Sequence, residues 1–224
     1  MGIVGLLQVS APAKNSQLEL SLPYSSFILP ALGLSTGLAQ LLSQLDTRQT
    51  HFGVSFDGQA AFPSVDREIQ IRELYSCGET GDILQYSKCT YENTVSRMKQ
   101  NGKVSREIVE YKGARQGHKR SSGHFKSYIN PCLITADTSQ LGFYIGPICV
   151  SVICIADDTY VLSGNPRSLQ GLVDIIGHYG RRYRLIFGAE KTKVTVTGST
   201  HDMKYYSENN VWTFHDYKLK VSSV

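Results

Sequence analysis

The chain has 224 residues, a formal net charge of +4 and five cysteines. That length suffices for one large or two small domains with a buried core. No apolar run reaches the roughly 18 residues that a membrane-spanning helix needs, and an odd cysteine count without a CxxC pair indicates reduced thiols. We therefore expect an intracellular protein, nuclear or cytoplasmic, that has no membrane partner.

Apolar residues at the start of the chain show no regular spacing. Prolines interrupt residues 1–34, which predicts an irregular or degraded segment. Leucines at helical spacing predict a helix over 35–45, and an apolar strand is expected over 51–56, running into Asp57. Helices are expected over 64–74 and, more weakly, over 81–91.

Asn101-Gly102 marks a hairpin near the middle of the chain, because this dipeptide favours the positive φ angles of a tight turn. The flanking strands are expected over 94–100 and 104–111. The remainder alternates between helices and strands, with helices over 122–134 and 168–183 and strands over 142–145, 148–155, 160–162, 194–197 and 212–221. Antiparallel hairpins mixed with helices indicate an α+β fold.

Positive charge is concentrated between Arg97 and Lys126. This stretch holds nine basic residues against Glu107 and Glu110, a net charge of +7. Lys and Arg release counterions when they meet phosphates, so the stretch suits a nucleic-acid partner. A solvated hairpin and helix face explains the charge equally well.

Three aspartates adjoin apolar strands. Asp57 ends one strand, and Asp157 and Asp158 lie between two others. Neighbouring carboxylates beside a core repel each other, and a divalent cation is the usual remedy. The plainer interpretation of the pair is a hairpin turn, in which Asp is common.

Four short motifs occur in an order that resembles the reverse transcriptase domain of non-LTR (LINE-like) retrotransposons, of an invertebrate-type subgroup. They are Phe56-Asp57-Gly58-Gln59-Ala60-Ala61-Phe62-Pro63-Ser64-Val65, Gly113-Ala114-Arg115-Gln116-Gly117, Ile155-Ala156-Asp157-Asp158 and Phe187-Gly188-Ala189-Glu190-Lys191-Thr192-Lys193. Each motif is weak alone, but four in the family's order are specific. The resemblance covers about residues 35–221.

The resemblance implies a polymerase palm, with an antiparallel sheet, flanking helices, partial fingers and no complete thumb. Residues 35–200 would form the palm and fingers core. Residues 201–224 would form a strand pair that leads towards an absent thumb. The chain is accordingly expected to be truncated, and the parent protein to carry endonuclease and thumb regions.

The resemblance also implies a site for phosphoryl transfer. Asp57 and Asp157 would bridge two Mg²⁺ ions (Mn²⁺ as an alternative), with Asp158 close by and the carbonyl of Phe56 as a further ligand. Lys191 would sit near the departing pyrophosphate as a general acid or charge stabiliser. A solvated lysine at a strand end is the plainer interpretation.

The resemblance implies five residues for the nucleotide site: Phe56, Phe62, Arg115, Gln116 and Gly117. Phe62 would act as a steric gate against the 2′-hydroxyl of ribonucleotides. This is favoured over packing in the core, because packing alone would not require its placement after the metal-binding Asp. Arg115, Gln116 and Gly117 would line the pocket, because a glycine lets the backbone approach a base or sugar closely. The expected partners are an RNA template, a DNA primer and deoxynucleoside triphosphates.

The chain departs from the family pattern at several points. Ile155 replaces the usual Tyr before Ala-Asp-Asp, and the residues after Gly117 are more basic than usual. The basic fingers residues that grip the triphosphate are not recognisable. Activity as an RNA-directed DNA polymerase is therefore expected for the family, while a catalytically inactive remnant that at most binds nucleic acid stays open for this chain.

Two other classes compete with this interpretation. An RNA-dependent RNA polymerase also uses a palm with paired aspartates, but a bulky Phe62 disfavours it. A structural or interaction domain with a chance Asp-Asp turn would have to match four ordered motifs by accident.

Overall fold

The computed structural model describes residues 50–58, 61–115, 117, 119–145, 148–155, 158–209 and 212–222. All of them belong to one compact unit, Thr47–Val224. The segment 1–34 and the helix expected over 35–45 lie outside the described residues. Gln116 and Asp157 do too, so their predicted roles stay predictions.

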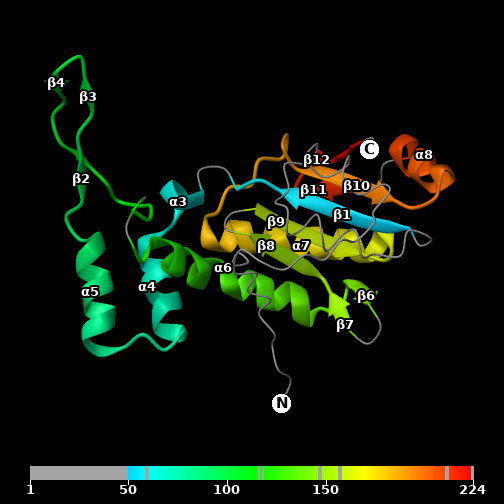
Figure 1. The fold of residues 1–224 in the computed structure, drawn as a ribbon, viewed down its shortest axis with the longest axis horizontal. Coiled ribbons are helices and arrows are strands. Elements are labelled where there is room, and N and C mark those ends of the chain that lie inside the picture. Colours follow the sequence, from blue (N-terminus) through cyan, green and yellow to red (C-terminus); the bar gives the residue numbers. More distant parts are fainter. Residues whose placement is uncertain are drawn as a thin grey trace, which may run out of the picture. The chain divides into compact units, whose positions relative to one another are not determined.

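A five-stranded sheet forms the centre of this unit (Figure 1), in the order β13-β10-β1-β9-β8. The strands are β1 (His51–Phe56), β8 (Val152–Ile155), β9 (Asp158–Ser163), β10 (Lys193–Thr197) and β13 (Lys220–Ser222). Neighbouring strands are antiparallel except β10 and β13, which are parallel. β1 takes the middle because its apolar residues Phe52, Val54 and Phe56 are almost completely buried.

Two long helices, α6 (Ser121–Thr138) and α7 (Pro166–Tyr183), pack against the sheet. α7 contacts β1 and β9, and α6 contacts β8 and α7. The cause is an apolar stripe at helical spacing, whose members are fully buried: Leu169, Leu172, Val173 and Ile176. Asn165 caps α7 by accepting a 2.8 Å hydrogen bond from the amide of Ser168.

The helix expected over 64–74 is two helices, α3 (Ala61–Ser64) and α4 (Arg67–Ser76). The helical conformation is interrupted at Asp66. Its carboxylate accepts hydrogen bonds from the amides of Glu68 and Ile69 and so caps α4. α4 packs against α6, and α5 (Gly81–Tyr91) packs against α4. The expected helix over 81–91 is confirmed.

The predicted hairpin around Asn101-Gly102 is confirmed, and the turn has φ angles of 49° and 77°. Its strands are shorter than expected: β2 (Val95–Ser96) pairs with β5 (Ile108–Val109), and β3 (Lys99–Gln100) with β4 (Lys103–Val104). Two more small hairpins complete the described strands: β6 (Phe143–Ile145) with β7 (Ile148–Val150), and β11 (Thr213–Phe214) with β12 (Tyr217–Lys218).

Further differences concern element boundaries and one added helix. The strand expected over 148–155 divides at Ser151 into β7 and β8. α6 extends past the expected end at 134 and contains Pro131. α8 (Thr200–Glu208) lies in the segment expected to hold only strands, and packs against β10 and β13. In the described part of the chain, no helix combines the length and apolarity needed to cross a membrane.

Candidate active site

Asp57 lies where β1 leaves the buried sheet. Its backbone carbonyl accepts a 3.2 Å hydrogen bond from the amide of Gly188, and Gly58 forms a bridge with Phe187. The first and fourth predicted motifs are therefore joined through the backbone. The Asp57 side chain is 38% exposed, so its carboxylate reaches the surface at this end of the sheet.

Asp158 lies at the same end of the sheet as Asp57. β1 and β9 are antiparallel, with Phe56 paired with Thr159. Asp57 follows Phe56 and Asp158 precedes Thr159, so the register brings the two acids to adjacent strand ends. Asp158 is exposed and is itself the first residue of β9, paired with Ile155 of β8. β9 therefore begins at Asp158, two residues before the start at 160 that the sequence predicted.

Lys191 contacts Asp57 directly. Its ammonium Nζ lies 2.8 Å from Asp57 Oδ2. The segment is shaped by Gly188, whose carbonyl accepts hydrogen bonds from the amides of Lys191 and Thr192 at 3.1 and 2.9 Å. The Thr192 hydroxyl donates a further 2.9 Å bond to the same carbonyl, and Thr192 is buried. This turn holds Lys191 just before the start of β10, where its side chain contacts Asp57.

The contact with Asp57 shifts the pKa of the lysine. The hydrogen bond to Asp57, and then the charge of Asp57, raise the pKa of Lys191 above its ordinary value. Because the lysine side chain is 67% exposed, solvent screens the pair and its contribution to stability is small. Its chemical consequence is a positive charge held 2.8 Å from the Asp57 carboxylate.

Phe62 packs as the core alternative expected, and its role as a steric gate stays a prediction. It is half-buried and packs against the core, and its ring stacks on that of Phe125 in α6, with centroids 4.8 Å apart and planes at 23°. Its carbonyl accepts a 2.8 Å hydrogen bond from the amide of Ala114. The aromatic ring is therefore anchored on one side by α6 and tied to the second motif through the backbone.

Gly113 makes the approach of the second motif possible. Its amide donates a 2.7 Å hydrogen bond to the carbonyl of Val65. Its φ is +94°, and a Cβ there would lie 3.0 Å from the carbonyl oxygen of Pro63. Only glycine combines this backbone conformation with so close a contact. Arg115 and Gly117 follow and are exposed, which leaves both accessible to a ligand.

Arg67 holds this region together and was not predicted from the sequence. Its side chain is only 11% exposed. It donates hydrogen bonds to the carbonyls of Gly113 and Tyr91 at 3.0 Å. Burial is the largest influence on its pKa, which is lowered, and Glu110 opposes the effect. An arginine at the start of a helix gives no sequence signal of such a role, because exposed arginines are common there.

The donor chemistry at the strand ends fits a divalent cation. Asp57 and Asp158 supply carboxylate oxygens, the ligands that Mg²⁺ prefers. The Lys191 ammonium on Asp57 shows that this end of the sheet accommodates positive charge. Within the described residues there is no cluster of three metal-ligating side chains, and the third predicted ligand, Asp157, lies outside that part of the chain.

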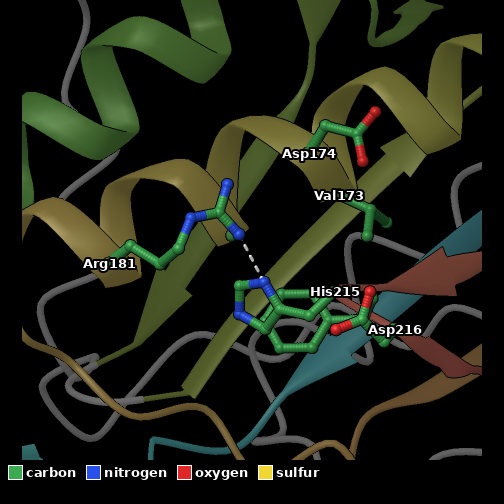
Figure 2. A pocket seen from close by; sticks show the side chains of 7 residues that line it. Val173, Asp174, Arg181, His215 and Asp216 are labelled. Atoms are coloured by element: carbon green, nitrogen blue, oxygen red, sulfur yellow. Dashed lines mark hydrogen bonds between the residues drawn. The ribbon is translucent and has the colours of Figure 1, made fainter.

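A separate recess lies between α7 and the turn that joins β11 to β12 (Figure 2). Its volume is about 580 Å³. The Arg181 guanidinium donates to Nδ1 of His215 at 2.5 Å across it. Its described lining residues are Val173, Asp174, Gly177, Arg181, Phe214, His215 and Asp216. None of the predicted site residues is among them.

The sequence matches the family of reverse transcriptases (RNA-dependent DNA polymerases) over residues 9–213. The match spans most of the chain, so the chain belongs to this family. A search among curated proteins found no match.

The fold is similar to that of solved telomerase structures. Apo telomerase from Candida tropicalis, truncated from its C-terminal domain, superposes with a TM-score of 0.53 at 14% identity, over 73% of this chain and 34% of the telomerase chain. Telomerase from Candida albicans with the TWJ fragment of telomeric RNA gives 0.53 at 13% identity, over 72% and 29%. The chain thus spans about a third of these proteins. The expected α+β palm fold with an antiparallel-rich sheet is confirmed.

Proposed function

We propose that this chain is the core of an RNA-directed DNA polymerase of the non-LTR, LINE-like type. It would add deoxynucleotides to the 3′-hydroxyl of a DNA primer on an RNA template. The observation that supports this most is the meeting of Asp57, Asp158 and Lys191 at one end of the sheet. Membership of the reverse transcriptase family supports the reaction class.

The proposed chemistry is phosphoryl transfer. Asp57, Asp157 and Asp158 would hold two Mg²⁺ ions, which when bound lower the pKa of an attacking hydroxyl and neutralise the leaving group. Lys191 would exchange its contact with Asp57 for the departing pyrophosphate and stabilise its charge. The position of its ammonium 2.8 Å from Asp57 supports this role, because it puts a positive charge beside the proposed metal ligand.

Nucleotide selection is assigned to Phe62 with Arg115, Gln116 and Gly117. The stacking of Phe62 on Phe125 limits the freedom of its ring, and a rigid ring excludes a 2′-hydroxyl better than a mobile one. Arg115 is exposed beside the backbone junction between Phe62 and Ala114. From there its guanidinium would reach the phosphates or the template base.

A primer-extension assay with Mg²⁺, an RNA template and either deoxy- or ribonucleoside triphosphates tests the proposal. We expect extension with deoxynucleotides only, and a loss of at least about 100-fold for Asp57→Asn, Asp157→Asn and Asp158→Asn, as befits groups that stabilise a transition state. Asp82→Asn, on the exposed surface of α5, is the matched control and should retain full activity.

The same assay separates the rival functions. Preferential incorporation of ribonucleotides would indicate an RNA polymerase. A folded chain that binds template and primer but does not extend the primer would indicate an inactive remnant, and the proposed activity would be abandoned. Phe62→Val should admit ribonucleotides if the ring is the gate, whereas a ring that only packs would change stability and leave selectivity as it is.

A further inference from the structure

The hairpin Thr94–Tyr111, called the arm below, has almost no buried surface. Every residue from Arg97 to Val104 is exposed. Apolar side chains are exposed along its length, with exposed fractions of 42–67%: Val95, Met98, Val104, Ile108 and Val109. Figure 1 shows β2, β3 and β4 as a long two-stranded ribbon that continues to the turn between β3 and β4. An isolated ribbon of two strands is marginally stable in water, so its order has to come from its base or from a partner.

Arg67 fixes the base of the arm. Its guanidinium donates to the hydroxyl of Thr94 and to the carbonyl of Glu110, both at 2.6 Å. The two legs also pair with each other, since the amide of Glu110 donates a 2.9 Å bond to the carbonyl of Thr94. The same guanidinium binds the carbonyl of Gly113. The arm is therefore joined rigidly to the segment that leads into the proposed nucleotide pocket.

The outer half of the arm carries unbalanced positive charge. Both acids of the arm already have ion-pair partners. Glu107 pairs with Arg97, and Glu110 pairs with the buried Arg67. Lys99, Lys103 and Arg106 are exposed. They form no ion pair with the described residues, which include every acid of the arm.

The arm contains a bulge at Arg106 and Glu107. β2 and β5 pair Ser96 with Ile108, whereas β3 and β4 pair Lys99 with Val104. The second strand thus contains one more residue than the first between these pairs. The amide of Ser105 donates a 2.8 Å hydrogen bond to the carbonyl of Met98, so Arg97 lies opposite both Arg106 and Glu107. A bulge interrupts the regular alternation of side chains, and the exposed cations Lys99, Lys103 and Arg106 lie at this interruption and beyond it towards the turn.

We propose that the arm is a nucleic-acid-binding element that grips the phosphodiester backbone of the strand entering or leaving the polymerase site. This inference rests on the proposed function. Charge complementarity identifies the partner, because Lys and Arg without acidic neighbours favour phosphates. The exposed apolar side chains beside them suit sugar and base faces. The fixed base transmits the position of the bound strand to the segment of Gly113.

Binding of the full chain to two fluorescent probes tests the arm: a single-stranded RNA, and an RNA–DNA hybrid of the same sequence. Anisotropy is measured over a series of KCl concentrations. The variant Lys99→Glu/Lys103→Glu/Arg106→Glu is compared with Lys88→Glu/Arg167→Glu/Lys204→Glu, which makes the same change in charge at exposed positions outside the arm. The milder Lys99→Gln/Lys103→Gln/Arg106→Gln repeats the test without charge reversal.

The arm variant is expected to raise Kd at least about tenfold and to flatten the dependence of log Kd on log salt by roughly two to three, as for three lost phosphate contacts. A loss on the RNA alone assigns the arm to the template strand, and a loss on the hybrid alone to the duplex. The proposal is overturned if the arm variant binds like the control variant, or if the wild-type chain binds neither probe. Because binding is measured without polymerisation, a chain that binds through its arm yet fails to extend a primer contradicts only the proposed function.

Discussion

At the scale of single residues, Arg67 is the clearest case of a side chain whose role depends on tertiary structure. It makes five hydrogen bonds to four residues, Tyr91, Thr94, Glu110 and Gly113. Its guanidinium also lies over the ring of Tyr91, 5.4 Å from the centroid. No local pattern in the sequence indicates these contacts, because they join positions that are up to 46 residues apart.

Arg67→Met tests that role. The substitution leaves the carbonyls of Gly113 and Glu110 without their donor in a partly buried setting, so we expect a loss of about 2–4 kcal/mol in the free energy of unfolding. Urea denaturation measures the loss. Arg72→Met, at an arginine whose side chain is 58% exposed, should change stability by less than about 0.5 kcal/mol. Equal effects of the two substitutions would refute the structural role of Arg67.

Gly113 gives a second prediction at this scale. Gly113→Ala places a Cβ against Pro63 at a φ of +94°, and we expect a loss of about 1–3 kcal/mol. Gly123 in α6 has open space around it and an ordinary helical φ. Gly123→Ala should therefore be neutral or stabilise the chain by up to about 1 kcal/mol. Thermal unfolding of both variants measures these changes. If Gly113→Ala leaves the stability unchanged, the close contact between Gly113 and Pro63 is contradicted.

At the scale of elements, the sequence indicated most of the strands and helices of the described part, but several of their ends depend on contacts. α7 was predicted because Leu169, Leu172 and Ile176 repeat at helical spacing. α8 was not predicted, because none of its residues is buried and no apolar stripe marks it. The split between α3 and α4 follows from the cap by Asp66, which was taken as part of one longer helix.

The candidate site was likewise predicted in part from its motifs, while its contacts depend on the tertiary structure. The motifs indicated Asp57, Asp158 and Lys191 as residues of one site, and their order was enough to suggest it. The contact between Lys191 and Asp57 was not predictable from spacing, because 134 positions separate them and the turn at Gly188 sets the geometry. The roles of Asp157 and Gln116 stay predictions.

Gln170 connects two elements and permits a prediction about their coupling. Its amide donates a 2.9 Å hydrogen bond to the carbonyl of Thr213 and accepts one from the amide of Thr213, also at 2.9 Å. Gln170→Leu should release β11 from α7 and cost about 1–2 kcal/mol. Hydrogen exchange of the Thr213 amide should then accelerate. Gln85→Leu, on exposed α5, serves as the control, and unchanged exchange at Thr213 would show that other contacts hold β11.

At the scale of the whole molecule, buried tyrosines set the alkaline limit of stability. Burial raises the pKa of Tyr160 to about 12, and it also raises that of Tyr128 to about 12, each from an ordinary value of 10.0. The folded state therefore holds protons that the unfolded chain releases first. This contribution to stability is complete below about pH 10 and is lost as the pH rises towards 12.

The prediction is a fall in the free energy of unfolding between these pH values. For Tyr160, a difference of two pKa units corresponds to about 2–3 kcal/mol. Tyr160→Phe should flatten the fall by that amount in denaturation curves recorded across the range, because it removes the titrating hydroxyl. Tyr217→Phe, at a tyrosine that is 64% exposed, should leave the curve unchanged. The same slope in wild type and Tyr160→Phe would rule out this origin.

The account as a whole depends on the proposal that Asp57, Asp157 and Asp158 bind a divalent cation together. Fe²⁺ bound in place of Mg²⁺, with added hydrogen peroxide and ascorbate, generates hydroxyl radicals that cleave the nearby backbone, and sizing the fragments by mass spectrometry measures this directly. We expect cuts beside Asp57 and beside Asp157-Asp158 together, suppressed by excess Mg²⁺ and absent in Asp57→Asn. Cuts at only one of these segments, or cuts that Asp57→Asn leaves in place, would contradict the shared metal site.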